Sequence, residues 1–390
     1  MKHLSGKSDL RQGPLAGIMV LDLSRVLAGP YCTMMLGDMG ATVIKVEHPG
    51  DGDDTRRFGP PYVAGESAYY LGLNRNKYGI TLDFGTPEGK ERLLDLVKKA
   101  DILVQNFRPG SLDRKGLGYE DLKALNPGLI YCSISGYGQT GPRRELPGYD
   151  YIAQAESGLM SITGEVDGEP MPVGSPIEDV STGMYACIAI LAALRAREST
   201  GKGQHLDLSL FECAVTMLAN VASNTLISGE EALRHGNAHA NIIPYQSFHT
   251  RDGYIAVACG NDGLFRGLCR LLQRDNLARD PRFATNSLRL SHHEELINIL
   301  QAIFLGRDTA DWLASLREAG IPSSPINTVS EALRDEQLAA RGLIWECEHP
   351  TAGTIRLVGS PMHFSDTPMR LYKAPPLLGE DNETILDEQR

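Results

Sequence analysis

The chain has 390 residues, of which 42% are hydrophobic, and a formal net charge of -11 at neutral pH. This length predicts two domains, and the hydrophobic fraction is typical of a folded globular protein. The acidic balance argues against broad binding to nucleic acids or anionic membranes, although it is compatible with a local basic pocket for a phosphorylated ligand.

Strands and helices alternate through the first half of the chain. Short apolar runs predict strands at 18–23, 41–47, 79–83, 101–105 and 129–133. Helices are expected between them at 28–39, with Pro30 in the first turn, and at 87–99. A long apolar helix follows Asp179, then a strand at 205–209 and a helix at 210–226. This alternation predicts an α/β fold with a doubly wound parallel sheet.

The polar segment that begins at residue 228 is expected to lead into a smaller α+β region. Its predicted strands lie near 246–249 and 254–258, and its predicted helices near 263–272, 293–305 and 309–319. Two further strands near 343–348 and 354–358 precede a Pro-rich extended segment at 374–379, which we expect to return to the first domain. We therefore expect a large domain of residues 1–227 and 331–390, and a small domain of residues 228–330.

Seven cysteines are scattered along the chain and form no C-x-x-C pair. This pattern is typical of reduced thiols and argues against a structural zinc site, so we expect no metal. No uninterrupted apolar run approaches the roughly 20 residues that cross a bilayer. Residues 1–13 resemble a short disordered lead-in without the apolar core of a signal peptide. We expect a cytoplasmic protein, or one of the mitochondrial matrix if the chain is a trimmed eukaryotic one.

The first strand–helix unit resembles a dinucleotide site in one respect only. Glu47 ends the second strand, where such a fold places its ribose-binding acid, but the turn at 25–30 lacks the G-x-G-x-x-G fingerprint. Without those glycines the backbone has no close approach to a pyrophosphate, so an NAD-dependent oxidoreductase is the least favoured alternative. The sequence motifs of phosphate loops, nucleophile elbows and zinc proteases are also absent.

Asp179 precedes the apolar run at 184–194, and two interpretations compete for it. An Asp at this place is commonly a helix cap that accepts hydrogen bonds from free backbone N–H groups. A carboxylate can also attack an acyl group to form a covalent intermediate, and a helix N-terminus would keep it ionised. The segment alone favours the cap, whereas the rest of the chain favours the nucleophile. The adjacent Glu178 is expected to be solvated or structural.

Segments along nearly the whole chain resemble class III CoA-transferases, the family of formyl-CoA transferase and carnitine CoA-transferase. They occur in the family's order at Pro14–Asp54, Leu73–Lys77, Asn106–Gly110, Leu112–Arg114, Ile134–Pro142, Gly174–Asp179, Thr200–Gln204 and Pro376–Glu380. Several segments look most like the succinyl-CoA–glutarate CoA-transferase branch, namely residues 53–56, 69–70, 73–77, 129–135, 234–248 and 252–257. The resemblance implies a Rossmann-like large domain, a smaller domain and an interlocked homodimer.

The resemblance also implies the chemistry and the partners. Asp179 would attack the thioester of a donor acyl-CoA, and CoA would pass through a mixed anhydride and an aspartyl-CoA thioester to an acceptor acid. Coenzyme A, carried as an acyl-CoA, and small carboxylic acids are therefore the expected ligands. We expect succinyl-CoA as donor and glutarate, 3-hydroxy-3-methylglutarate, itaconate or a similar dicarboxylate as acceptor.

Carried over residue by residue, the resemblance predicts the positions that bind CoA. They are Leu27, Ala28, His48, Leu82, Asp83, Asn106, Phe107, Arg108, Arg114 and Tyr149. Formyl-CoA transferase has Gln in place of Leu27 and Arg in place of His48, which argues against formyl-CoA and leaves a phosphate contact of His48 open. Arg56 and His239 are candidates for the distal carboxylate of the acid, and Phe58 and Tyr149 for the acyl pocket.

Tyr149 separates two chemistries within the family. The α-methylacyl-CoA racemase branch carries His in a Gly-His-Asp triplet and uses it to move the α-proton, whereas this chain has Gly148-Tyr149-Asp150. A phenol is a poor base at neutral pH, so racemisation is disfavoured. A racemase-like enzyme and a catalytically silent CoA-binding homologue remain the alternatives to a transferase.

Overall fold

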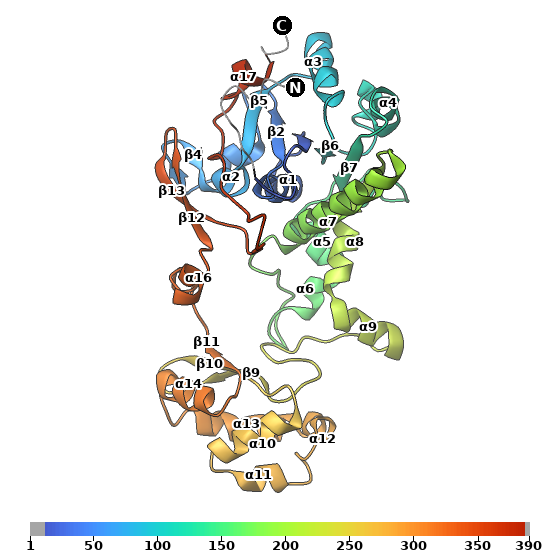
Figure 1. Cartoon of the computed structure of the whole chain (residues 1–390). Coiled ribbons are helices and arrows are strands. Elements are labelled where there is room, and N and C mark those ends of the chain that lie inside the picture. Colours follow the sequence, from blue (N-terminus) through green and yellow to red (C-terminus); the bar gives the residue numbers. More distant parts are fainter. Residues whose placement is uncertain (1–11, 387–390) are drawn as a thin grey trace. The chain divides into compact units, whose positions relative to one another are not determined.

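The computed structural model describes residues 12–386, and the chain divides into two compact units (Figure 1). Unit 1 comprises Met1–Leu159, Pro172–Glu230 and Glu336–Arg390, and unit 2 comprises Met160–Met171 and Glu231–Asp335. The domain boundaries expected from the sequence were 228 and 331, and residues 160–171 were expected in the large domain. The predicted lead-in at 1–13 lies almost entirely outside the described residues.

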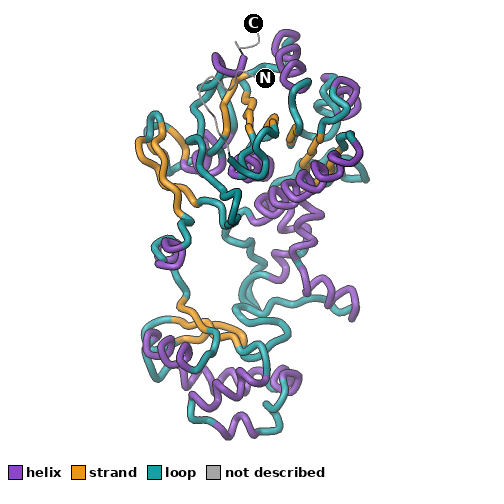
Figure 2. The backbone as a smooth tube through the Cα atoms, viewed as in Figure 1, coloured by secondary structure: helices purple, strands orange, loops and turns teal. Residues whose placement is uncertain are grey.

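Unit 1 is built on a six-stranded sheet with the strand order β5-β2-β1-β6-β7-β8. Every neighbouring pair in this sheet is parallel, which confirms the parallel sheet predicted from the alternation of strands and helices. That alternation can be followed along the chain in Figure 2. The strands are β1 (Met19–Asp22), β2 (Thr42–Glu47), β5 (Lys77–Thr81), β6 (Ile102–Gln105), β7 (Ile130–Ser135) and β8 (His205–Ser209).

Two apolar clusters cover the two faces of this sheet. On one face, strand side chains pack against α1 (Ala28–Asp38) and α7 (Ile177–Thr200). On the other face they pack against α3 (Pro87–Val97), α4 (Tyr119–Leu125) and α17 (Asn382–Leu386). Because both faces are covered, the central strands are buried along nearly their whole length, as is usual for parallel sheets.

The other elements of unit 1 are short, apart from the helices that follow β8. They are η1 (Asp54–Arg57), β3 (Tyr62–Val63), β4 (Glu66–Ser67), α2 (Ala68–Leu73), η2 (Asp113–Lys115), α5 (Asp150–Ser157), α16 (Glu336–Ala340), β12 (Ile344–His349) and β13 (Gly353–Val358). Helix α6 (Leu159–Ile162) lies where the chain first passes from unit 1 to unit 2.

Helix α7 packs closely on α1. A Cβ atom at Gly183 would lie 2.6 Å from the carbonyl oxygen of Ala28, so only glycine permits this approach. The contact places the start of α1 beside the second turn of α7. By length and composition α7 could also cross a membrane, as could the bent pair α8–α9 if it were one span, but core helices of globular proteins pass the same test.

The apolar helix predicted at 210–226 is two helices in the structure. Helix α8 (Leu210–Met217) and α9 (Ala219–Ser228) meet at an angle of 79°. At the break Ala219 has a φ of 47°, in the left-handed region. Neither Gly nor Pro occurs between residues 210 and 228, so the apolar pattern carried no signal for the break.

Unit 2 has the α+β composition predicted for it. Its three-stranded antiparallel sheet has the order β11-β10-β9, and the side chains of Phe248, Phe265, Phe283, Phe304 and Trp312 form part of its core. Its elements are β9 (Tyr245–His249), β10 (Tyr254–Ala258), α10 (Asp262–Leu271), α11 (Asp275–Arg279), α12 (Asn286–Ser291), α13 (His293–Phe304), α14 (Thr309–Glu318), β11 (Ser323–Pro325) and α15 (Val329–Ala332).

The C-terminal segment returns to unit 1 along the edge strand β5, as the Pro-rich tail predicted. The backbone N–H of Asn76 donates to the carbonyl of Lys373 at 2.9 Å. The side-chain oxygens of Asp381 and Asn382 accept the backbone N–H groups of Gly79 and Thr81, each at 2.8 Å. The tail therefore occupies part of the hydrogen-bonding edge of the sheet.

Candidate active site

A cavity of about 400 Å³ opens in unit 1 where strands β1, β6 and β7 end. The carboxyl ends of parallel strands are where open α/β sheets bind ligands. The residues that follow these strands line the cavity, together with the loop before α5 and the first turn of α7. Among them are the predicted residues Leu27, Ala28, Asn106, Phe107, Arg108, Arg114, Tyr149 and Asp179.

Asp179 lies in the first turn of α7 but does not cap this helix. Pro176 occupies the N-cap position and supplies no side-chain hydrogen bond. The free N–H groups are bound from another helix: Oδ1 of Asp150 accepts the N–H of Glu178 at 2.8 Å and that of Asp179 at 3.2 Å. Among the described residues, the Asp179 carboxyl has no hydrogen bond or ion pair, so the cap interpretation is wrong and the group is free to meet a ligand.

The charge state of Asp179 is set by its neighbours. Burial is the largest cause that raises the pKa of Asp179 to about 7, and its acidic neighbours Asp150 and Glu178 follow. The helix N-terminus was expected to keep Asp179 ionised, but Asp150 already binds the free N–H groups there, and burial and nearby acids disfavour a charge on Asp179. At neutral pH Asp179 titrates instead of being fully charged.

Glu178 is buried, with none of its surface exposed. Burial, followed by the charge of Asp150, raises its pKa to about 7. Ser181 donates to its Oε2 at 3.4 Å, and its Oε1 has no hydrogen-bond partner. A solvated role for Glu178, one of the two that we considered from the sequence, is therefore excluded.

The loop between β1 and α1 is held in a strained conformation at the edge of the cavity. Val26 has a φ of 69°, which is costly for a β-branched residue. Its N–H donates to Asp53 at 3.2 Å, and the side chain of Asn106 bonds both the N–H and the carbonyl of Arg25, at 2.9 and 2.7 Å. Asn106 thus shapes the cavity wall by fixing this loop.

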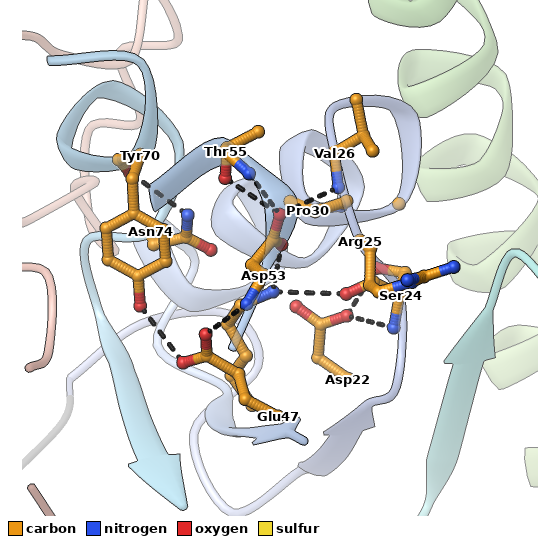
Figure 3. A network of polar contacts seen from close by, with 12 residues as sticks. Asp22, Ser24, Arg25, Val26, Pro30, Glu47, Asp53, Thr55, Tyr70 and Asn74 are labelled. Atoms are coloured by element: carbon orange, nitrogen blue, oxygen red, sulfur yellow. Dashed lines mark hydrogen bonds and ion pairs between the residues drawn. The ribbon is translucent and has the colours of Figure 1, made fainter. Parts of the chain in front are cut away.

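Asp53, which Figure 3 shows with Val26 and Ser24 of this loop, also belongs to a buried ion pair. The ammonium of Lys45 is 2.8 Å from Asp53 and also donates to the carbonyl of Ser24 at 3.1 Å. Burial opposes the charge on Asp53, but Lys45 and hydrogen bonds from Thr55 outweigh it and lower the pKa of Asp53 to about 2. The anion that orients Val26 therefore stays charged at neutral pH.

Three arginines bring positive charge to the cavity. Arg25 pairs with Asp54 at 3.3 Å and lies over the ring of Phe107, 5.5 Å from its centre. Arg108 and Arg114 are exposed and form no ion pair among the described residues, and both also line a neighbouring cavity of about 350 Å³. Guanidinium groups that are free in this way fit the phosphate oxygens of a ligand such as CoA.

A family model described as CoA-transferase family III matches residues 15–382. The chain belongs to CoA-transferase family III. It is 46% identical to the succinyl-CoA:glutarate CoA-transferase of Mus musculus over 96% of this chain and 86% of the mouse protein. It is also 46% identical to the succinate–glutarate CoA-transferase of Agrobacterium fabrum, over 97% and 96% of the two chains. The predicted family and enzyme class are confirmed.

The fold agrees with a solved member of the same group. The crystal structure of a CAIB/BAIF family protein from Brucella suis matches 97% of this chain and 100% of its own, with a TM-score of 0.86 and 46% identity. The name of the mouse relative gives a CoA thioester, succinyl-CoA, as the ligand of that protein.

Some predicted CoA-binding residues of this CoA-transferase lie outside the cavity. His48 is exposed beyond the end of β2, Leu82 belongs to the apolar core, and Asp83 accepts the N–H of Gly85 at 2.9 Å. They follow β2 and β5, whereas the cavity follows β1, β6 and β7. One contact connects the two places, because the ring of Phe84 meets that of Phe107 edge-on with 5.9 Å between their centres.

Arg56 is bound inside unit 1. Its guanidinium pairs with Glu47 at 2.7 Å, donates to the hydroxyl of Tyr70 at 2.6 Å and to the carbonyl of Pro376 at 3.1 Å, and lies 3.8 Å from the centre of the Tyr70 ring. Its side chain is 10% exposed. Arg56 is absent from the cavity lining, and these contacts give it a structural task.

The other two candidates for the acid substrate lie apart from the cavity lining. Phe58 is half-exposed, and its ring meets that of Tyr69 edge-on at 5.6 Å. His239 belongs to unit 2, where its Nδ1 accepts the N–H of Asn241 at 3.0 Å and its ring lies 5.2 Å from that of Tyr245.

Two residues near the nucleophile were not selected from the sequence. Burial, followed by the charges of Asp179 and Asp150, raises the pKa of Tyr69 to about 12, so its phenol stays neutral in the neighbourhood of these two acids. Asp150 organises the start of α7. From the sequence, Tyr69 was noticed only as part of the branch resemblance, and Asp150 only as the last residue of the triplet 148–150. That triplet was the signal that could have identified Asp150. Among residues 12–386 no cluster of His, Cys, Asp and Glu is suited to hold a metal.

Proposed function

We propose that this protein transfers CoA from succinyl-CoA to glutarate or a similar dicarboxylate, with Asp179 as the nucleophile. The observation that carries the proposal is the carboxyl of Asp179, which lines the cavity without a hydrogen bond or ion pair among the described residues. The names of the mouse and Agrobacterium relatives support the substrate pair.

The proposed reaction has two halves that mirror each other. A carboxylate oxygen of Asp179 attacks the thioester carbonyl, the C–S bond breaks, and CoA leaves as the thiolate, giving a mixed anhydride. The thiolate then attacks the aspartyl carbonyl, which releases succinate and leaves an aspartyl-CoA thioester. The acceptor carboxylate attacks this thioester, and the same steps in reverse give the new acyl-CoA and free Asp179.

The residues around Asp179 have separate tasks in this proposal. Asp150 fixes the first turn of α7, and Tyr69 places a neutral phenol beside the reacting carboxyl. Arg108 and Arg114 supply charge for the phosphates of CoA. Water must be kept from the anhydride, since hydrolysis would otherwise compete with transfer.

The distal carboxylate of the acceptor needs a cationic or donor-rich partner. Arg56 is already bound to Glu47, which leaves His239 as the candidate from our sequence prediction. We also propose a homodimer. Exposed apolar side chains along α7, α8 and α9 support it, because such surfaces commonly mark protein interfaces. They are Met184, Tyr185, Ile188, Val215, Met217, Leu226 and Ile227.

A mass-spectrometric exchange assay tests the proposed function. The protein is incubated with succinyl-CoA and a panel of free mono- and dicarboxylic acids, and new acyl-CoA species are identified. We expect glutaryl-CoA or a related dicarboxylyl-CoA, together with an acyl-enzyme that hydroxylamine traps at Asp179. Transfer only to monocarboxylic acids or oxalate would overturn the substrate pair, and trapping at another residue would overturn the nucleophile.

A further inference from the structure

Three carboxyl groups meet at the start of α7. Asp150 comes from α5, and Glu178 and Asp179 are neighbours in the first turn of α7. Among the described residues no Lys, Arg or His forms an ion pair or hydrogen bond with any of the three. Three negative charges in one poorly solvated place, with no cation beside them, would repel each other strongly.

The surroundings of the three groups differ. Asp150 accepts hydrogen bonds from two backbone N–H groups and from Nε2 of Gln154, the last at 2.6 Å, as an ionised carboxylate does. Asp179 is partly exposed and lines the cavity. Glu178 is fully buried, and its Oε1 has no partner. An ionised Glu178 would leave a charged oxygen both desolvated and unbonded, which is the costliest arrangement of the three.

We propose that Glu178 is a protonated, neutral acid at working pH. It acts as a positioning residue, because its neutrality lets Asp179 be the acid of this cluster that loses its proton and carries the negative charge. The effect on Asp179 rests on the proposed function, in which Asp179 is the nucleophile. The identity of the residue matters because a Gln at this position would imitate the neutral acid, whereas an ionised Glu would repel the charge that must attack the thioester.

The groups that face this cluster from neighbouring helices agree with this assignment. From α8, the Cys213 thiol lies near Glu178, and burial raises the pKa of this thiol although a hydrogen bond with Thr182 opposes the change. From α2, Tyr69 is neutral, since its pKa is raised to about 12. None of these groups supplies a positive charge that would stabilise an ionised Glu178.

The protonation of Glu178 is coupled to that of Asp179. Two adjacent acids with similar affinities release their protons in two steps that belong to the pair. If burial keeps the last proton on Glu178, the first step produces an anionic Asp179 beside a neutral neighbour. Once Asp179 is acylated its charge is gone, and one cause of the repulsion on Glu178 disappears with it.

The first test compares pH profiles of kcat/KM for Glu178→Gln and the wild type. If Glu178 is neutral while Asp179 titrates, the midpoint of the acid limb stays where it is, because Gln replaces a group that was already uncharged. If Glu178 is ionised, Gln removes a negative charge beside Asp179, and the midpoint falls by roughly one pH unit. That fall would overturn the proposal.

The second test does not depend on activity. A carboxyl whose pKa is raised in the folded state stabilises the fold below its ordinary pKa, and this contribution is lost as the pH rises through about 7. Glu178→Gln should therefore match the wild-type Tm near pH 4 and exceed it increasingly up to about pH 8. Glu198→Gln, at the exposed end of the same helix, is the control and should show no such trend.

A third measurement uses the wild type alone, so it stands even if the variant does not fold. With ¹³C-labelled glutamate, the infrared spectrum near pH 6 should retain one protonated glutamate carboxyl that ionises around pH 7 or above. A spectrum with every glutamate ionised near pH 6, or a Tm difference independent of pH, would overturn the protonation of Glu178. If no CoA transfer is found, only the part about Asp179 fails, because these two readouts report on Glu178 itself.

Discussion

Oδ1 of Asp150 accepts the backbone N–H of Asp179 at 3.2 Å, so one acid holds in place the residue that carries the reactive acid. The same bond organises the first turn of α7 and brings a negative charge close to the nucleophile. Geometry and electrostatics therefore act in opposite directions at this contact. The bond fixes Asp179 toward the cavity, and the charge makes it harder to ionise.

Replacing Asp150 by Asn should separate these two effects. The amide oxygen still accepts N–H groups, but the charge that helps to raise the pKa of Asp179 to about 7 is removed. We expect the acid limb of kcat/KM, which rises as Asp179 ionises, to move down by roughly one pH unit. Asp150→Ala should also lose the cap and about 1 kcal/mol of stability, measured by urea unfolding. An unmoved midpoint in Asp150→Asn would show that Asp150 does not set the charge of Asp179.

Asp179→Ala should lower CoA exchange on the order of a thousandfold or more, because the proposed mechanism forms the acyl-enzyme on this carboxyl. The fold should persist. The raised pKa of Asp179 means that its stabilising contribution is already lost above about pH 7, so the variant should unfold at no lower a temperature than the wild type at pH 8. Calorimetry and hydroxylamine trapping check both statements. Residual trapping at the wild-type level would refute the assignment.

Arg108→Gln and Arg114→Gln should each raise KM for acyl-CoA roughly tenfold with little change in kcat, because they remove charge-assisted contacts to phosphate. The difference from the wild type should shrink as salt is added. Lys98, an exposed cation at the C-cap of α3, serves as the matched control, and Lys98→Gln should leave KM unchanged. If all three variants kept the KM of the wild type for acyl-CoA, both arginines would be excluded from CoA binding.

Arg56→Ala should destabilise unit 1. Removing one partner of a largely buried ion pair leaves Glu47 without compensation, which typically costs about 3–5 kcal/mol. Urea unfolding would show this loss, and KM values for mono- and dicarboxylates of the folded fraction should change alike. A stable variant with a selective rise in KM for dicarboxylates would instead assign Arg56 to the distal carboxylate.

The alternation of apolar strands with helices was sufficient to predict the parallel sheet, because the central strands β1, β6 and β7 are buried and therefore carry mostly apolar residues. Asp179 was identified through the segment that contains it. The cap of its helix was assigned to the wrong residue, because the true cap comes from Asp150, 29 residues earlier in the chain. A rule that reads only neighbouring residues cannot find such a tertiary contact.

The same limit explains the other differences. The bend at Ala219 occurs without a Gly or Pro as helix breaker, so the pattern at 210–228 gave no sign of it. From the sequence, Arg56 was a plausible partner for a substrate carboxylate, because the sequence does not show that Arg56 pairs with Glu47. Residue type predicts what a side chain can bind, but only the fold shows which partner has already taken it.

The C-terminal tail has a consequence for how the protein is made. Residues 373–382 bond to β5, although the whole of unit 2 separates them in the sequence. During synthesis the growing chain therefore exposes an unfinished sheet edge until those last residues leave the ribosome, and an unpaired edge invites association with other chains. Shortening the tail should thus reduce the yield of folded protein before it alters any residue of the active site.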